Sequence, residues 1–140
     1  MRDPSTHSFS LRVYYEDTDA AGIVYHARYL AFAERARTEW LRDLGFDHTR
    51  LRAEYDAAFA VRSAALDFKR PAVLDDWLEV RTRVAGMGGA SFAVQQMIWR
   101  DDTLLVGLDI GVVMVNGKLR PTRIPQPVRK LFAGMDLSEP

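Results

Sequence analysis

Residues 15–29, YEDTDAAGIVYHARY, combine a dense acidic cluster, a glycine and the start of a long helical pattern. Glu16, Asp17 and Asp19 stand close together, and Gly22 follows them. The first turn of a helix has backbone N–H groups without intrahelical partners and carries the positive end of the helix dipole. A carboxylate held beside such donors can attack, or activate water against, a carbonyl that the donors polarise. The stretch therefore indicates a turn that delivers acidic side chains to the N-terminus of one long helix.

The helical pattern runs from about Ala27 to Leu44 and stops at Gly45, a residue that favours the left-handed turn after a helix. One side of this helix is apolar at 3.6-residue spacing, with Leu30, Ala33, Trp40, Leu41 and Leu44. Arg37 falls inside the apolar stripe and Glu34 at its edge. Either Arg37 extends along the surface to reach water, or it forms an internal pair with Glu34, three residues away.

The chain after residue 56 shows the residue alternation of β-strands. Strands are expected over 58–68, 77–84, 91–98 and 104–115, with turns at 87–89 and 100–102. A first strand is expected over Phe9–Tyr15, and a short helix over Gln126–Ala133. One strand, one long helix and four hairpin-linked strands predict an α+β fold in which an antiparallel β-sheet wraps around one long central helix.

Composition favours an ordinary globular protein. The 140 residues fit a single domain, residues 1–140, with 48% hydrophobic and 27% charged residues. A net charge of zero argues against nucleic acid or an anionic membrane as partner. The absence of cysteine excludes disulfides and a Cys nucleophile, and it fits a reducing compartment. Residues 1–7 lack the apolar core of a signal peptide and no apolar run is long enough to span a bilayer, so we expect a cytoplasmic protein without membrane insertion.

The acidic cluster has three interpretations on residue types alone. It forms a polar corner in which Asp19 accepts hydrogen bonds from nearby backbone N–H groups, as aspartates in turns do. It binds a divalent cation, which we do not expect, because EF-hand spacing and a paired-His motif are both absent. Or it supplies a catalytic carboxylate beside the start of the helix.

Residues 12–19 (RVYYEDTD), 22–26 (GIVYH), Tyr29 and 33–39 (AERARTE) carry a family resemblance, with a weaker match at 118–121 (KLRP) and 124–125. The chain resembles the 4-hydroxybenzoyl-CoA thioesterase family of hotdog-fold enzymes, and within it the YbgC-like branch associated with the Tol–Pal system. The hotdog fold that this implies is the same sheet-around-helix arrangement that the residue pattern predicts.

The resemblance also implies a site. Asp19, the second Asp of the Asp-x-Asp pair, is the expected catalytic residue, as nucleophile or as general base. Backbone N–H groups at about Tyr25 and His26 are expected to bind the thioester carbonyl, and Gly22 and Val24 belong to the same substrate-binding segment. The His26 ring either donates to the carbonyl or relays a proton, or only its backbone matters.

Further substrate contacts are expected around this segment. Tyr14 and Tyr25 either line the acyl pocket or pack in the core. Glu34 is expected to bind substrate from the helix. The phosphates of coenzyme A need basic groups, for which the candidates are Lys69, Arg70 and Arg120.

The function that the resemblance implies is hydrolysis of short-chain or aromatic acyl-CoA to free acid and coenzyme A. No cofactor is expected, because coenzyme A is part of the substrate. Family members form homo-oligomers, either dimers or homotetramers built as dimers of dimers, with the site at a subunit interface, and an acyl carrier protein is a further candidate partner. The alternative from another class is a non-catalytic acyl-binding scaffold on the same fold. A hotdog dehydratase would need a catalytic His and Glu in another arrangement, which the sequence does not show.

Overall fold

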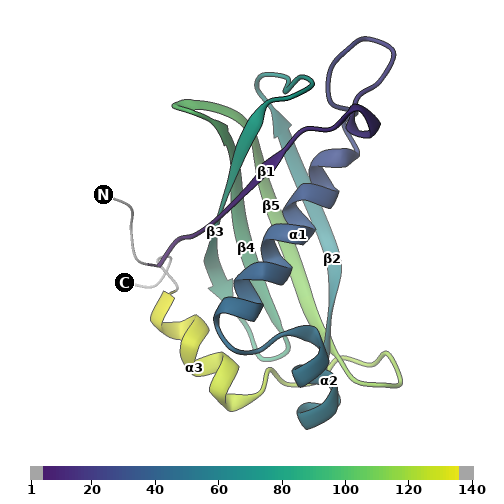
Figure 1. Cartoon of the computed structure of the whole chain (residues 1–140). Coiled ribbons are helices and arrows are strands. Elements are labelled where there is room, and N and C mark those ends of the chain that lie inside the picture. The colour runs from purple at the N-terminus through teal and green to yellow at the C-terminus, as the bar shows by residue number, and fades with distance from the viewer. Residues whose placement is uncertain (1–4, 136–140) are drawn as a thin grey trace.

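The computed structural model describes residues 5–135 and shows one long helix lying against an antiparallel sheet (Figure 1). Residues 1–4 lie outside the described part. They belong to the segment 1–7, for which no signal peptide was predicted. The elements follow in the order β1 (His7–Arg12), a 3₁₀ turn (Tyr15–Asp17), α1 (Arg28–Asp43), α2 (His48–Tyr55), β2 (Ala58–Phe68), β3 (Trp77–Met87), β4 (Ser91–Arg100), β5 (Thr103–Val115) and α3 (Gln126–Met135).

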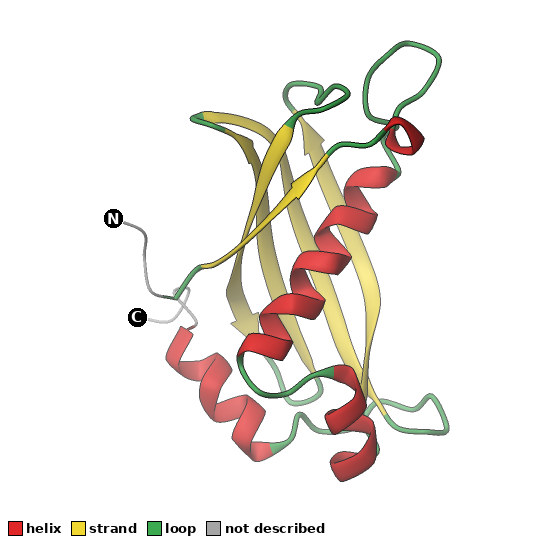
Figure 2. Cartoon of the chain, in the orientation of Figure 1, coloured by secondary structure: helices red, strands yellow, loops and turns green. Residues whose placement is uncertain are grey.

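The sheet has the strand order β1-β3-β4-β5-β2, and every neighbouring pair is antiparallel. It curves around α1, which lies along one of its faces (Figure 2). This arrangement confirms the predicted α+β class and the sheet around a central helix. Since β5 is the only neighbour of β2 within residues 5–135, the other side of β2 is an open edge of the sheet in that range.

The alternation predicted for β3 and β4 fixes which face of the sheet packs on α1. Val80 and Val84 of β3, and Val94 and Ile98 of β4, are fully buried, whereas their sequence neighbours are partly exposed. Two polar residues, Thr82 and Gln96, occupy the same inner face and are also fully buried. A buried amide or hydroxyl needs hydrogen-bond partners, so these two residues mark a polar connection inside an apolar core.

The helix α1 ends as predicted, with Gly45 at a φ of +87° just after its C-terminus. Its buried face differs from the predicted stripe at one point. Leu30 is 39% exposed, whereas Leu41 on the same side is buried. That side of α1 is covered only near its C-terminal end, where α2 follows in the chain (Figure 1). Among the described residues no helix is both long and apolar enough to cross a membrane.

Two local predictions are wrong. The first strand stops at Arg12, because the chain turns at Tyr15–Asp17 and does not stay extended to Tyr15. The helix α2 occupies a segment between residues 45 and 58 for which no element was predicted, and the Asp47 carboxylate caps it by accepting from the Arg50 N–H at 2.8 Å. His48 therefore begins a helix, and its side chain contacts Thr38 of α1.

Candidate active site

The acidic cluster divides into an anchoring residue and a solvent-accessible one. Asp17 is 3% exposed. One of its oxygens accepts from Nε and Nη2 of Arg28, at 2.9 and 2.7 Å, and the other accepts from the Tyr14 N–H at 2.8 Å. Its carbonyl oxygen accepts from the Tyr25 N–H at 2.8 Å. Asp17 therefore fixes the loop before α1 against the first turn of that helix. The local acceptor role that the polar-corner interpretation gives to Asp19 is also present, since Asp19 accepts from the Ala21 N–H.

A tight turn between Thr18 and Val24 holds Asp19. The Asp19 N–H donates to the Ile23 carbonyl at 2.9 Å, and Gly22 closes the turn at a φ of +82°, a conformation that favours glycine. The Asp19 carboxylate accepts from the Ala21 N–H at 2.9 Å through Oδ1. Within residues 5–135 its Oδ2 atom has no partner, so this oxygen remains available to a reactant. No group of three acidic or histidine side chains in that range is placed to hold a metal ion.

A pocket of about 300 Å³ lies in front of Asp19. It brings together five of the predicted site residues, which are Asp19, Val24, His26, Lys69 and Arg70. Four further lining residues had no predicted role, namely Ile23, Tyr29, Phe68 and Pro71. The pocket is thus lined by a carboxylate, an imidazole, two cationic residues and several apolar side chains.

The start of α1 supplies one unengaged backbone donor to this pocket. The Tyr25 N–H already donates to the Asp17 carbonyl. The His26 N–H has no acceptor among the described residues, and His26 lines the pocket. The two aromatic rings lie against each other, with centroids 4.4 Å apart, and both side chains are exposed. Of the two donors expected for a thioester carbonyl, only the His26 N–H is free in this conformation.

Tyr29 forms the buried side of the pocket. Its hydroxyl accepts from the Ala72 N–H at 3.0 Å, and the side chain is 3% exposed. Burial raises the pKa of Tyr29 above its usual value, and the negative charges of Asp76 and Asp19 raise it further. The phenol is therefore neutral at ordinary pH. Tyr29 follows Tyr25 by four residues, about one helical turn. This spacing was the signal that could have assigned Tyr29 to the site.

The remaining predicted residues lie elsewhere. Tyr14 and Tyr25 are 62% and 46% exposed and do not pack in the core, which excludes one of the two alternatives given for them, and neither lines the Asp19 pocket. Gly22 shapes the turn and does not line the pocket. Glu34 borders a different pocket, farther along α1. The internal pair of Glu34 with Arg37 does not form, because the Arg37 guanidinium donates to Gln96 Oε1 at 2.9 Å instead.

Arg120 lies far from Asp19 within one chain. Lys69 and Arg70 donate through their backbone N–H groups to the Leu105 carbonyl, near the start of β5. Arg120 follows the other end of that strand, where its carbonyl accepts from the Asn116 N–H. A strand rises about 3.3 Å per residue, so the ends of β5 are about 40 Å apart. Arg120 therefore belongs to the opposite end of the sheet from Asp19.

Comparison with known proteins agrees with this geometry. Residues 21–106 match the model of the Thioesterase superfamily. The chain belongs to the thioesterase superfamily. It is 46% identical over 126 residues to the acyl-CoA thioesterase YbgC of Haemophilus influenzae, covering 89% of this chain and 93% of that protein. It is 45% identical over 120 residues to the acyl-CoA thioester hydrolase YbgC of Escherichia coli O157:H7, covering 84% and 89%.

Solved structures of thioesterases share the architecture. A probable thioesterase from Bartonella henselae superposes with a TM-score of 0.83 at 41% identity, over 86% of this chain and 99% of that one. A 1,4-dihydroxy-2-naphthoyl-CoA thioesterase from Synechocystis superposes with a TM-score of 0.83 at 25% identity, over 96% and 99%. The predicted family, hotdog fold and enzyme class, a thioester hydrolase, are therefore confirmed for this member of the thioesterase superfamily.

Proposed function

We propose that this thioesterase hydrolyses short-chain or aromatic acyl-CoA to the free acid and coenzyme A. The observation that carries the proposal is the pocket in which Asp19 meets the start of α1. There Asp19, whose Oδ2 is unpaired in the described chain, and His26, whose N–H is unengaged there, line the same pocket. A carboxylate and a fixed backbone donor are the two groups that hydrolysis of a thioester needs.

In the proposed reaction the thioester carbonyl accepts from the His26 N–H at the positive end of the α1 dipole. Asp19 either attacks the carbonyl carbon, forming an anhydride that water then cleaves, or takes a proton from the water that attacks. In both cases the carbon–sulfur bond breaks and the thiolate of coenzyme A leaves. The Ala21 N–H holds one carboxylate oxygen in place, which directs the other toward the substrate. The reaction needs no cofactor.

Substrate contacts in the proposal follow the lining of the pocket. The apolar wall of Ile23, Val24 and Phe68 suits a short aliphatic or aromatic acyl group. Lys69 and Arg70 are the proposed partners of the phosphates of coenzyme A. The Lys69 ammonium forms an exposed pair with Asp67 at 3.0 Å, which a phosphate group can displace because such pairs contribute little.

The open edge of β2 supports a homodimer as part of the proposal. Two large apolar side chains on this strand are about half exposed, Val61 at 51% and Phe68 at 52%. A long unpaired edge with apolar side chains favours pairing with a second copy. Phe68 also lines the Asp19 pocket, so a partner along β2 would lie beside the proposed site. We further propose a dimer of dimers and a cytoplasmic location, which the absence of cysteine fits.

The test is thiol release from a panel of acyl-CoA substrates by the wild type, Asp19→Asn and the control Glu16→Gln. Glu16 belongs to the same acidic cluster but is exposed and does not line the pocket. We expect Asp19→Asn to lower kcat by about 100-fold or more with little change in KM, and Glu16→Gln to keep wild-type rates.

Other results would redirect the proposal. Wild-type kcat in Asp19→Asn would remove Asp19 from the mechanism. A wild type that binds acyl-CoA and turns over none of the panel would support the non-catalytic scaffold. Faster turnover of the same acyl group on an acyl carrier protein would change the proposed carrier.

A further inference from the structure

A second pocket, of about 370 Å³, lies between the later turns of α1, the start of α2 and the sheet. Three rings, those of Trp40, Phe59 and Phe92, form its apolar wall. The Phe59 and Phe92 rings meet edge to face at 5.2 Å, and Trp40 lies 6.5 Å from Phe92. This pocket shares no lining residue with the Asp19 pocket. It is large enough for a small organic ligand and offers that ligand an aromatic surface.

Arg37 brings a half-buried positive charge into this pocket. Its guanidinium has five N–H donors, of which only one, on Nη1, donates to a partner among the described residues. That partner is the neutral Oε1 atom of Gln96. Burial lowers the pKa of Arg37, although Glu34 acts in the opposite direction, and the guanidinium remains charged at ordinary pH. The pocket therefore contains a partly desolvated cation with unused donors.

Gln96 fixes the position of this cation. Its side chain is fully buried, and its amide nitrogen donates to the Ala33 carbonyl and to Thr82 Oγ1, both at 3.0 Å. Because both amide hydrogens are used on the core, only the amide oxygen can face Arg37. The guanidinium is thus held by α1 and two strands of the sheet, and its remaining donors are presented in a defined direction.

The comparison with other arginines shows what Arg37 lacks. Arg28, Arg42 and Arg100 each contact a carboxylate, at 2.7, 3.1 and 2.7 Å. Arg37 is half-buried, so water solvates its charge less than that of an exposed arginine. Even so, no carboxylate among residues 5–135 lies within 4.0 Å of it. Glu34, three residues earlier on the same helix, is exposed and acts on Arg37 only through space. An incoming carboxylate would supply the missing charge-assisted hydrogen bonds.

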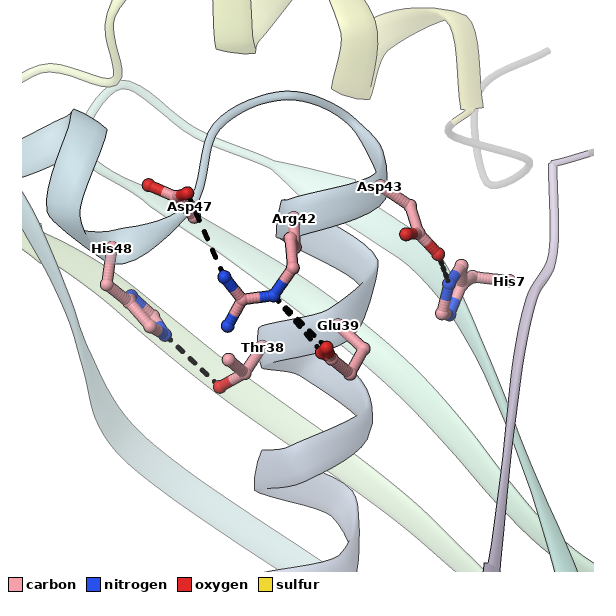
Figure 3. A network of polar contacts seen from close by, with 7 residues as sticks. All are labelled: His7, Thr38, Glu39, Arg42, Asp43, Asp47 and His48. Carbon is pink, nitrogen blue, oxygen red and sulfur yellow. Dashed lines mark hydrogen bonds and ion pairs between the residues drawn. The ribbon is translucent and has the colours of Figure 1, made fainter.

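Figure 3 shows how α2 is held over this end of α1. His48, at the start of α2, points to α1, and its Nε2 lies 3.2 Å from Thr38 Oγ1. Arg42 bonds Glu39 on its own helix and reaches Asp47 at 3.9 Å. Thr38 and His48 both line the pocket. These contacts join α2 to α1 at the pocket, whose lining includes a hydroxyl and an imidazole as well as Arg37.

We propose that this second pocket binds a free monocarboxylic acid, with the carboxylate on Arg37 and a small apolar body against Trp40, Phe59 and Phe92. The choice of ligand rests on the proposed function, because a thioesterase releases an acid of this class. The site itself rests on the cation, its fixed orientation and the aromatic wall. The enzyme would then hold its product class at a place separate from Asp19.

The test is calorimetric titration of benzoate, with benzamide as the uncharged probe of the same shape. We expect saturable binding of benzoate and much weaker binding of benzamide. Arg37→Met should weaken benzoate by about tenfold or more, because a charge-assisted pair is lost. Arg35→Met, which removes an exposed arginine of the same helix, should leave affinity unchanged. Asp19→Asn should also leave it unchanged, which separates this pocket from the proposed catalytic one.

Glu34→Gln adds a test that does not disturb the core. Glu34 is exposed and borders the pocket, so removing its negative charge should strengthen benzoate binding severalfold. Three results would overturn the proposal. The wild type and Arg37→Met could bind benzoate with equal affinity, or Glu34→Gln could bind it no more tightly than the wild type. Asp19→Asn could also be the one variant that changes benzoate binding. Lack of thiol release from acyl-CoA would refute the proposed function and leave this binding result unaffected.

Discussion

Replacing Asp17 by Asn should weaken both the fold and the activity, because this side chain holds the loop before α1. The Asp17 side chain is 4% exposed and its partner Arg28 is 31% exposed. Breaking a buried ion pair costs about 3–5 kcal/mol, and the partial exposure of Arg28 lowers this because water can still reach the guanidinium. Asn also keeps an oxygen for one of the donors. We therefore expect a loss of about 2–3 kcal/mol in the free energy of unfolding and a Tm lower by about 6–10 °C.

The assay is urea unfolding of Asp17→Asn, Arg28→Met and the double variant, which together give the coupling energy of the pair. We expect a coupling energy of about 1.5–2 kcal/mol, since the hydrogen bonds join two charged groups. The exposed pair of Arg42 with Glu39 is the matched control, and Arg42→Met should cost about 0.5 kcal/mol or less. Thiol release should fall together with stability in Asp17→Asn. A loss below about 1 kcal/mol, or a coupling energy no larger than that of the surface pair, would refute the anchoring role.

Two further predictions concern packing and pH. Gly111→Ala should lower the free energy of unfolding by about 1 kcal/mol or less, because the added methyl group collides with the hydroxyl of the exposed Ser63, whose side chain must rotate away. The same change at Gly107 makes only an ordinary contact, at 3.7 Å from Met97 Sδ, so it is the matched control in the same urea experiment. Burial raises the pKa of Tyr29, so as the pH increases the folded state loses the phenol proton later than the unfolded state does. The contribution of Tyr29 to stability is therefore complete below about pH 10 and declines above it. The stability difference between the wild type and Tyr29→Phe, measured by urea unfolding at pH 8 and pH 11, should therefore shrink at the higher pH.

The fold was predictable because its strongest signals are local. Alternation along β3 and β4 identifies their buried faces, and Gly45 marks the end of α1. The helix α2 was missed because it has only eight residues and hardly any apolar face, with Leu51 as its one buried residue. Its N-cap, Asp47, was the available signal. The exposure of Leu30 was not predictable, since it depends on where α2 comes to rest along α1.

The site was predictable where its residues are close in sequence and less so where the sheet brings them together. Asp19, Val24 and His26 come from one continuous segment and line one pocket. Phe68 reaches the same pocket only because β2 ends beside the start of α1, which no spacing along the chain reveals. Arg120 lies far from Asp19 within one chain, because its motif match carried no information about which end of the sheet the C-terminal end of β5 occupies.

The loop before α1 uses neighbouring groups for opposite purposes. Asp17 and the Tyr25 N–H are engaged within the protein, whereas Asp19 Oδ2 and the His26 N–H have no partners among residues 5–135, and Asp19 and His26 both line the pocket. In the proposed reaction the first pair holds the second pair in position. The two aspartates should therefore separate in experiment. Asp17→Asn lowers stability and kcat together. Asp19→Asn lowers kcat and leaves stability nearly unchanged, because the Asn oxygen can still accept from the Ala21 N–H in this exposed turn. Equal destabilisation by both changes, measured by urea unfolding, would show that Asp19 also serves the fold and that this division of roles is wrong.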